Sequence, residues 1–342
     1  MNLKPLPKLE LLQALRAIAA LAVVFFHTGY QPGYGAYGVS IFFVLSGVIM
    51  AMLFESDESP GQFLQRRLIR ILPLYWCMTT LAAAITWLVP ASRTSGNVGG
   101  IYEYILSLTF IPFRANDGAI VPMLGPGWTI NYEIAFYLTC VVGLFLSRRR
   151  PLLATTLLVL VWWYLERSTT GVASEFYGRS LILYFVAGMI VWQFSKITSL
   201  RIQGRRYLLL ILLACTALAY LEFLSNHQQG SSLNEKLRAL LAVAVVAAGL
   251  FLEPAFQRFS SVGRAVLVEI GDASYAIYLS HIFVIHLLTI VARKLGIVDA
   301  GLGWALVSVL VSTIVGILIH RYFDSPIQKR LRNYFRRPTL AR

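Results

Sequence analysis

Long apolar stretches follow one another along most of this chain, separated by short polar or turn-rich segments. A helix needs about 20 apolar residues to cross a hydrocarbon core about 30 Å thick. We read the stretches of about this length as transmembrane helices. They are 11–28, 38–54, 71–90, 128–147, 151–165, 180–196, 207–224, 237–252, 272–293 and 302–321. The pattern predicts an all-α integral membrane protein, a bundle of about ten transmembrane helices.

The segments between these stretches are too short for a separate soluble domain. The longest, residues 91–127, carries an apolar patch at 105–113, which we expect to be re-entrant or interfacial. A basic tail over about residues 322–342 suits anionic headgroups. We therefore predict one membrane domain over 1–342, with helices from about 11 to 321.

Composition and charge agree with this picture. Hydrophobic residues make up 57% of the chain and charged residues 13%, whereas soluble domains carry about 25% charged residues. The net charge is +14, and most of the 30 Lys and Arg lie in alternate loops and the tail. The positive-inside rule then predicts that both termini are cytoplasmic, in a multi-pass protein of the cell inner (plasma) membrane. This distribution argues against nucleic-acid binding.

The cysteines do not indicate a metal site. Cys77, Cys140 and Cys215 all lie in predicted helices, at no spacing typical of metal ligands. We interpret them as packing residues and predict no bound metal.

Two ionisable residues lie in the first apolar stretch. Arg16 and His27 are eleven residues apart, with only apolar residues between them. Eleven steps of about 100° end about 20° past three turns, so both lie on one helix face, about 16 Å apart along the axis. An ionisable group in hydrocarbon costs about 2.5–3.5 kcal/mol even on insertion scales. The pair indicates a polar path through the membrane.

A carboxylate on another helix is expected at the depth of His27. Glu133 follows Trp128 by about one and a half turns, near the outer end of the predicted helix 128–147. A carboxylate within reach of an imidazole can orient it and support it as a general base. A pair that only ties two helices together is the alternative.

Three arginines precede the third apolar stretch. Arg66, Arg67 and Arg70 lie at its expected cytoplasmic mouth, and Arg67 and Arg70 share a helical face. The planar guanidinium suits phosphate, so a diphosphate or a phosphorylated nucleotide is the expected ligand. Ordinary positive-inside anchoring is the alternative, and charge alone favours it.

Other intramembrane polar residues remain open to two readings. Ser46, beside Gly47, would admit either a neighbouring helix or an acyl chain. Tyr275 and His281 fall toward mid-membrane, where His281 serves either structure or chemistry. Asp324, at the end of the last stretch, is expected to pair locally at the cytoplasmic face.

In combination, these motifs resemble the membrane acyltransferase type 3 family over essentially the whole chain. The motifs are Arg16 with His27, Gly38–Gly47, Arg67–Trp76, Trp128–Glu133 and Gly271–His281. One departure is Asp324-Ser325-Pro326, where the family pattern has glutamate and a basic residue around the proline.

The resemblance implies an O-acyltransferase that moves acetyl from cytoplasmic acetyl-CoA to a sugar hydroxyl of an exopolysaccharide, O-antigen or similar surface glycan. Acetyl-CoA would be a co-substrate, with no tightly bound cofactor. Implied partners are a glycan or lipid-linked glycan acceptor, membrane lipids and polysaccharide-assembly proteins. The implied catalytic residues are His27, Glu133 and Arg16; Arg66, Arg67, Arg70, Ser46 and Tyr75 would bind the coenzyme, and Trp128, Tyr275 and His281 the acceptor.

Two other classes of protein compete with this reading. A transporter or flippase for a lipid-linked glycan would use His27 and Glu133 as a proton relay, but the chain shows no obvious internal repeats. A membrane scaffold without chemistry would not retain such costly buried groups. We therefore favour the acyltransferase.

Overall fold

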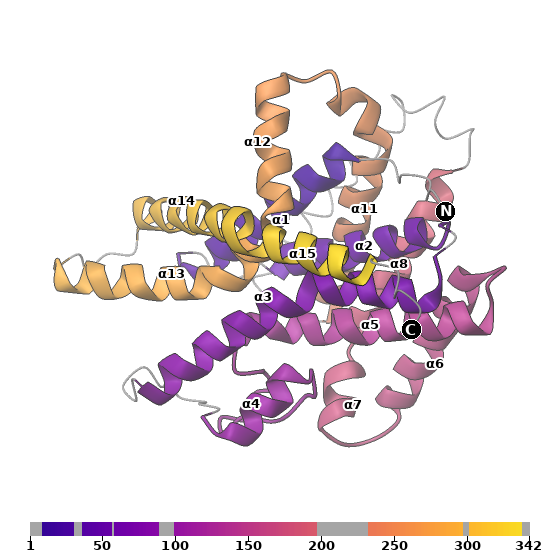
Figure 1. The fold of residues 1–342 in the computed structure, drawn as a ribbon, viewed down its shortest axis with the longest axis horizontal. Coiled ribbons are helices and arrows are strands. Elements are labelled where there is room, and N and C mark those ends of the chain that lie inside the picture. Colours follow the sequence, from indigo (N-terminus) through magenta and orange to yellow (C-terminus); the bar gives the residue numbers. More distant parts are fainter. Residues whose placement is uncertain are drawn as a thin grey trace. The chain divides into compact units, whose positions relative to one another are not determined.

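The computed structural model describes residues 9–30, 36–56, 58–88, 99–196, 232–296 and 301–336. These residues form helices and connecting loops, without β-strands (Figure 1). By length and hydropathy, six of the described helical segments can cross a membrane. They are Glu10–His27, Pro60–Leu88, Gly125–Leu146, Leu237–Phe256, Ser274–Lys294 and Leu302–Phe335. The described part of the chain is thus all-α, as predicted, and its long apolar helices suit a multi-pass membrane protein.

Other parts of the topology remain predictions. Two shorter apolar helices, Tyr37–Leu53 and Ser180–Ser195, fall within predicted spans. The predicted helix 207–224 and Cys215 lie outside the described residues. The count of ten spans and the cytoplasmic termini therefore stay predictions.

The described helices cluster into two compact units. Unit 1 holds α1 (Glu10–His27), α2 (Ala36–Leu53), α8 (Leu183–Ser195), α11 (Ser232–Phe256), α12 (Ser261–Asp272) and most of α13 (Ser274–Lys294) and α14 (Leu302–Ile319). Unit 2 holds the helices of the middle of the chain: α3 (Pro60–Leu88), α4 (Ile101–Leu108), η2 (Gly125–Gly127), α5 (Trp128–Leu146), α6 (Pro151–Arg167), α7 (Val172–Tyr177) and η3 (Ser180–Ile182). It also holds the last helices, which are the end of α14, the π-helical turn η4 (His320–Asp324) and α15 (Ser325–Arg336). Residues Tyr278–Ser280 of α13 belong to unit 2 as well. Whether both act as the single domain predicted over 1–342 stays a prediction.

Glycines allow helices of unit 1 to touch backbone to backbone. A Cβ on Gly47 of α2 would lie 2.0 Å from the Phe185 carbonyl oxygen of α8, and one on Gly188 would lie 2.0 Å from the Val44 oxygen. Neither position tolerates a side chain without movement of a helix. Phe43 stacks on Phe185 beside this contact, with ring centroids 4.7 Å apart. This close packing is one of the two roles expected for the Ser46–Gly47 segment.

The N-terminus of α1 is fixed by side chains of unit 1 that lie far away in the sequence. Its first turn has no side-chain cap of its own. Instead, the Glu253 carboxylate of α11 accepts hydrogen bonds from the backbone N–H groups of Glu10 and Leu11, at 2.9 and 2.8 Å. Arg264 of α12 pairs with the Glu10 carboxylate at 2.8 Å. A carboxylate at a helix N-terminus also complements the helix dipole, so α1 begins at a defined place.

Unit 2 is built around α3 and α5. Helix α3 contacts α4, α5 and α15, and α5 contacts α6. Gly143 of α5 admits Thr155 of α6, whose Oγ1 lies 2.2 Å from the position of a Cβ on that glycine. Helix α3 continues through Pro73, which lacks an N–H donor and disturbs the preceding turn.

Several predicted boundaries are wrong. Helix α3 begins at Pro60 instead of 71, so the three arginines lie within the helix and not before it. Residues 261–272 and 325–336 form helices α12 and α15, where we expected a loop and a basic tail. Charged residues lower the hydropathy that marked the predicted spans, yet arginine, lysine and glutamate are good helix formers. Hydropathy therefore missed these polar helices.

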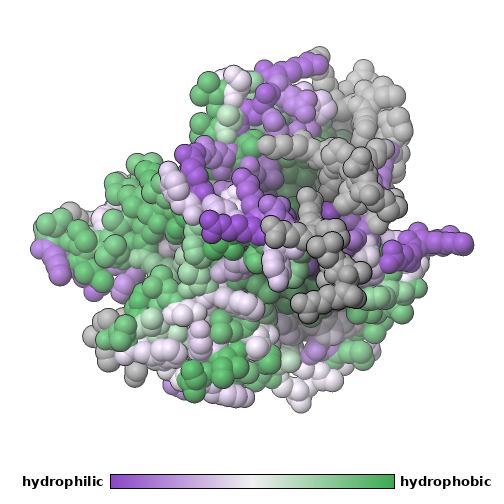
Figure 2. All heavy atoms as spheres, in the orientation of Figure 1, coloured by the Kyte–Doolittle hydropathy of each residue, from purple (hydrophilic) through white to green (hydrophobic). Residues whose placement is uncertain are grey.

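The surface of unit 1 is apolar over α13 and α14. Figure 2 shows hydrophobic side chains gathered over these helices, and Leu287, Leu295, Leu302 and Leu310 are among the exposed residues. A continuous exposed apolar surface of this kind suits contact with lipid.

Candidate active-site residues

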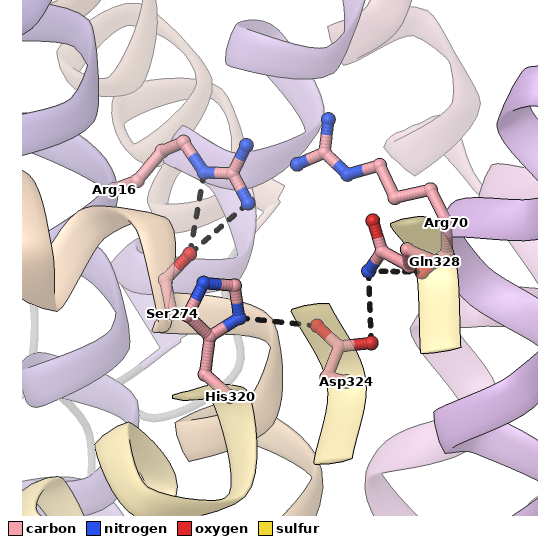
Figure 3. Close-up of polar contacts among 6 residues, drawn as sticks. All are labelled: Arg16, Arg70, Ser274, His320, Asp324 and Gln328. Atoms are coloured by element: carbon pink, nitrogen blue, oxygen red, sulfur yellow. Dashed lines mark hydrogen bonds and ion pairs between the residues drawn. The ribbon is translucent and has the colours of Figure 1, made fainter. Parts of the chain in front are cut away.

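Arg16 is buried in unit 1 and has a polar partner. Its side chain is only 8% exposed. Nε and Nη2 both donate to Ser274 Oγ, at 3.2 and 3.0 Å (Figure 3). Ser274 is the first residue of α13, and Ala273 alone separates it from the end of α12. Packing of α12 on α1 thus supplies the acceptor, and a Cβ on Gly271 of α12 would lie 2.0 Å from the Gln13 oxygen of α1.

His27 ends α1 with one ring nitrogen already engaged. Its Nδ1 lies 2.8 Å from the Val23 carbonyl oxygen, one turn earlier. A carbonyl oxygen only accepts, so Nδ1 carries the proton of the neutral ring. The lone pair is then on Nε2, and the residue is solvent-exposed in the structure. This tautomer suits a general base that receives a proton at Nε2.

The structure brings His281 to His27 within unit 1. Their ring centroids are 4.8 Å apart, and the planes meet edge to face at 61°. His281 of α13 is fully buried, in contrast to His27. Sequence spacing gave no sign of this contact, because 254 residues separate the two histidines. The contact places His281 where it can shape the surroundings of the His27 ring.

The arginines of α3 differ in their surroundings within unit 2. Arg66 forms an ion pair with Glu58. Arg67 interacts electrostatically with Tyr137, Arg70, Glu133 and Glu58. Yet among the described residues no hydrogen-bond partner reaches its Nε and Nη1, and both atoms are shielded from solvent. Buried donors without partners are rare in proteins, so these two nitrogens fit an anionic ligand.

Glu133 lies in unit 2, whereas His27 lies in unit 1. The Tyr137 hydroxyl, one turn further along α5, donates to the Glu133 carboxylate. The i, i+4 spacing of these residues was visible in the sequence, but we did not predict this hydrogen bond. The proposed pairing of Glu133 with His27 stays a prediction.

A hydroxyl network fixes the start of α5 in unit 2. Thr129 Oγ1 donates to Tyr278 OH at 3.0 Å, and Tyr278 OH donates to the Pro126 oxygen at 3.1 Å. Trp128, at the head of the same helix, meets Tyr132 edge to face with centroids 6.0 Å apart. Sequence reasoning did not assign Tyr278 a role, although it lies in the motif that includes Tyr275. Acceptor binding by Trp128 and Tyr275 stays a prediction.

Tyr75 and Ser46 are both buried. Tyr75 donates to the Ser107 carbonyl oxygen at 2.9 Å and stacks on Phe110, with centroids 4.9 Å apart. Its ring and hydroxyl therefore hold the α4 segment against α3. Coenzyme binding by Tyr75 and Ser46 stays a prediction.

Asp324 pairs locally, as predicted, although it lies in a π-helical turn rather than at a helix end. Asp324 Oδ2 is 3.1 Å from His320 Nδ1, and Oδ1 accepts from Gln328 Nε2 at 2.8 Å (Figure 3). The Asp324 side chain is 2% exposed. Two donors thus balance the cost of burying this carboxylate.

An exposed ion pair joins two connecting segments of unit 2 outside the spans. Arg114 forms an ion pair with Glu175 of α7. The hydrogen bond that Arg114 donates to the Glu175 carboxylate raises the pKa of Arg114 and lowers the pKa of Glu175. Both groups are exposed, so the pair is a minor contribution to stability.

Unit 1 therefore holds a histidine whose lone pair is on Nε2, and unit 2 holds an arginine with two buried donors that have no hydrogen-bond partner among the described residues. Among the described residues, no group of three His, Cys, Asp or Glu side chains gathers as a metal site would require. Comparison with known proteins decides the family. The model of the acyltransferase 3 family, described as an acyltransferase domain, matches residues 10–322. This chain belongs to that family.

Named relatives of this acyltransferase cover different shares of it. The exopolysaccharide production protein ExoZ of Rhizobium meliloti is 32% identical over 312 residues, which is 89% of this chain and 92% of ExoZ. The putative membrane-bound transacylase BcsY of Komagataeibacter xylinus is 27% identical over 54% of this chain and 51% of its own length. The peptidoglycan O-acetyltransferase OatA of Listeria monocytogenes is 24% identical over 95% of this chain and 57% of OatA. No solved structure matches this acyltransferase significantly.

Proposed function

We propose that this acyltransferase moves an acetyl group from acetyl-CoA to a sugar hydroxyl of an exopolysaccharide or similar cell-surface glycan, at the plasma membrane. Membership of the acyltransferase family supports transfer of an acyl group. The name of ExoZ supports an exopolysaccharide acceptor, and the name of OatA supports O-acetyl transfer.

The observation that carries the proposed chemistry is the hydrogen bond of His27 Nδ1 to the Val23 oxygen. It leaves Nε2 as the basic atom. In the proposed step, Nε2 takes the proton of the sugar hydroxyl while the hydroxyl oxygen attacks the thioester carbonyl carbon. The C–O bond forms, the C–S bond breaks, and the coenzyme A sulfur receives the proton from the imidazolium. Atoms and charges balance without a metal or redox partner.

In this proposal the arginines of α3 bind the coenzyme A phosphates. Arg67 supports this role best, because its Nε and Nη1 are buried donors with no hydrogen-bond partner in the described part of the chain. Guanidinium groups bind phosphate through paired, charge-assisted hydrogen bonds. Arg66 and Arg70 would add charge to the same face. Glu133 and Arg16 would act as positioning groups on their own helices.

The test is acetyl transfer in proteoliposomes that contain the purified protein. Acetyl-CoA labelled in the acetyl group is supplied with a soluble acidic exopolysaccharide, and label on the polysaccharide is measured. We expect wild-type protein to label the acceptor and His27→Ala to lose at least about 100-fold in rate. His286→Ala, which removes an exposed histidine of α13, is the matched control and should retain activity.

The outcomes separate the function classes. Equal labelling by wild type and His27→Ala would remove His27 from the chemistry. Movement of a lipid-linked glycan across the bilayer without acetyl-CoA would support the flippase instead. Label that stays on the protein when the acceptor is omitted would place the acetyl group on His27 Nε2 as an acyl-imidazole, before transfer to the hydroxyl.

A further inference from the structure

The last helices of unit 2 contain a polar cluster around one buried carboxylate, and the proposed chemistry does not use it. We call His320, Asp324 and Gln328 the tail cluster; they lie four residues apart in succession, across η4 and α15. Asp324 is the shared acceptor, at 3.1 Å from His320 Nδ1 and 2.8 Å from Gln328 Nε2. A carboxylate that is 2% exposed is costly unless its oxygens are hydrogen-bonded.

The turn that carries this carboxylate is π-helical. Residues His320–Asp324 form a π turn between α14 and α15, within one continuous helical segment. Single π turns are uncommon and cost stability, and they often lie at functional sites. His320 begins this turn and Asp324 ends it, and the side chains of His320 and Gln328 both reach the Asp324 carboxylate. The irregular turn thus carries two members of the tail cluster, His320 and Asp324, and α15 carries the third.

The other end of the tail cluster reaches α3 beside the arginines. Gln328 Nε2 lies 3.5 Å from the Arg70 carbonyl oxygen, at the long limit of a hydrogen bond (Figure 3). Pro73 lacks the N–H that would donate to the Ile69 carbonyl oxygen, so one α3 backbone bond is missing next to Arg70. A donor from α15 therefore contacts α3 one residue after the carbonyl that Pro73 leaves without its helical donor. Packing of α15 on α3 brings the two elements together.

We infer that Asp324 is a positioning residue for the arginine face of α3. It orients the Gln328 amide toward the Arg70 carbonyl, and this contact sets where Arg67 and Arg70 are held. The inference rests on the proposed function, in which these arginines bind the donor. Loss of the contact should therefore weaken donor binding and leave the transfer step largely intact.

The test compares Asp324→Leu, Gln328→Leu and Asp324→Asn with wild type. Each leucine variant removes one partner of the Asp324–Gln328 bond. Asparagine keeps both contacts, because its oxygen accepts from Gln328 and its amide donates to the other tautomer of His320. Two readouts are taken on the full chain in detergent: hydrogen exchange of α3 backbone amides near Arg70, and kcat and KM for acetyl-CoA. Gln257→Leu, at an exposed glutamine after α11, is the control.

Both leucine variants should speed exchange in α3 and raise the KM for acetyl-CoA about three- to tenfold, with kcat changed less than about twofold. Asp324→Asn and Gln257→Leu should match wild type. Unchanged exchange in Gln328→Leu overturns the inference. This variant keeps the His320–Asp324 pair, so it still decides the question if Asp324→Leu fails to fold. Faster exchange with unchanged KM in an active enzyme also overturns it. Faster exchange in a protein whose wild type transfers no acetyl group upholds the positioning of α3 and rejects the proposed function.

Discussion

The buried arginines of the two units differ in their hydrogen-bond partners. In unit 1, Arg16 donates hydrogen bonds from Nε and Nη2 to Ser274 Oγ. The Glu253 carboxylate accepts a hydrogen bond from the first turn of the same helix, α1. In unit 2, charged groups that include Glu133 and Glu58 interact electrostatically with Arg67, but no hydrogen-bond partner among the described residues reaches its Nε and Nη1. Both side chains bear the same guanidinium, so the difference lies in what the surrounding helices supply.

Arg16 is thus a buried donor that the protein already satisfies, whereas Arg67 has buried donors that a ligand could satisfy. A buried donor with a protein partner is already stabilised, whereas one without a partner loses hydration without compensation. The free energy lost at Arg67 is recovered when an anion binds, which favours ligand binding at that site. The hydrogen bonds of α1 instead favour a fixed orientation of Arg16 and His27. In the proposed function, unit 1 therefore holds its groups in a fixed orientation and unit 2 binds the acetyl donor.

The most damaging change should be Gly271→Ala, which tests whether α1 is held rigidly. The added Cβ would lie 2.0 Å from the Gln13 oxygen, so α12 and α1 must separate. We expect a loss of about 3 kcal/mol or more in the free energy of unfolding, seen as a lower thermal midpoint in detergent. Gly263→Ala on the same helix meets no atom within 4 Å and is the matched control. Equal midpoints for the two variants would show that α1 is not fixed by this contact.

Removal of Arg67 tests whether its buried donors bind acetyl-CoA, as proposed for unit 2. Arg67→Ala should raise the KM for acetyl-CoA about 10- to 100-fold, as expected for loss of charge-assisted hydrogen bonds to phosphate. Steady-state kinetics in proteoliposomes would measure it, with Arg148→Ala at the exposed end of a loop as control. Equal KM values for the two variants would reject phosphate binding by Arg67 and favour positive-inside anchoring as the role of these arginines.

A smaller effect is expected from Ser274→Ala, which removes the acceptor used by Arg16. We predict a fall in kcat of about three- to tenfold with little change in KM for acetyl-CoA, because Arg16 is assigned to orientation and not to donor binding. Ser260→Ala, at an exposed serine before α12, should behave as wild type. A rise in KM without a fall in kcat would mean that Arg16 belongs to the donor site as well.

The smallest effect concerns the exposed Arg114–Glu175 pair of unit 2. The pKa of Glu175 is lowered by Arg114, so its stabilisation is present above the ordinary glutamate pKa of about 4.3 and is lost as pH falls through the lowered value. Glu175→Gln should lower the thermal midpoint by about 1–2 °C at neutral pH. The two proteins should converge in acid. A difference that grows as pH falls would reverse the sign of this linkage.

Sequence patterns predicted the apolar elements of the fold closely. The first predicted helix, 11–28, corresponds to Glu10–His27, and 128–147 corresponds to Trp128–Leu146. Polar helices were missed because hydropathy was the signal: α12 carries Arg264, Glu269 and Asp272, and α15 is rich in arginine. Helix propensity and amphipathic spacing would have been needed to find them.

The candidate residues were visible in the sequence, but most of their partners were not. Costly groups in apolar stretches identified Arg16, His27 and Glu133. Ser274 and His281 reach α1 only through tertiary packing over more than 250 residues, which no local pattern reports. The bond between Tyr137 and Glu133 is different, because its i, i+4 spacing was predictable.

The most direct test of the central claim is a single-turnover measurement with purified His27→Ala protein. Binding of labelled acetyl-CoA and transfer of its acetyl group to the glycan are measured in the same sample. We predict donor binding within about twofold of wild type and transfer slower by at least about 100-fold. Transfer at the wild-type rate would contradict the assignment of His27 as the base.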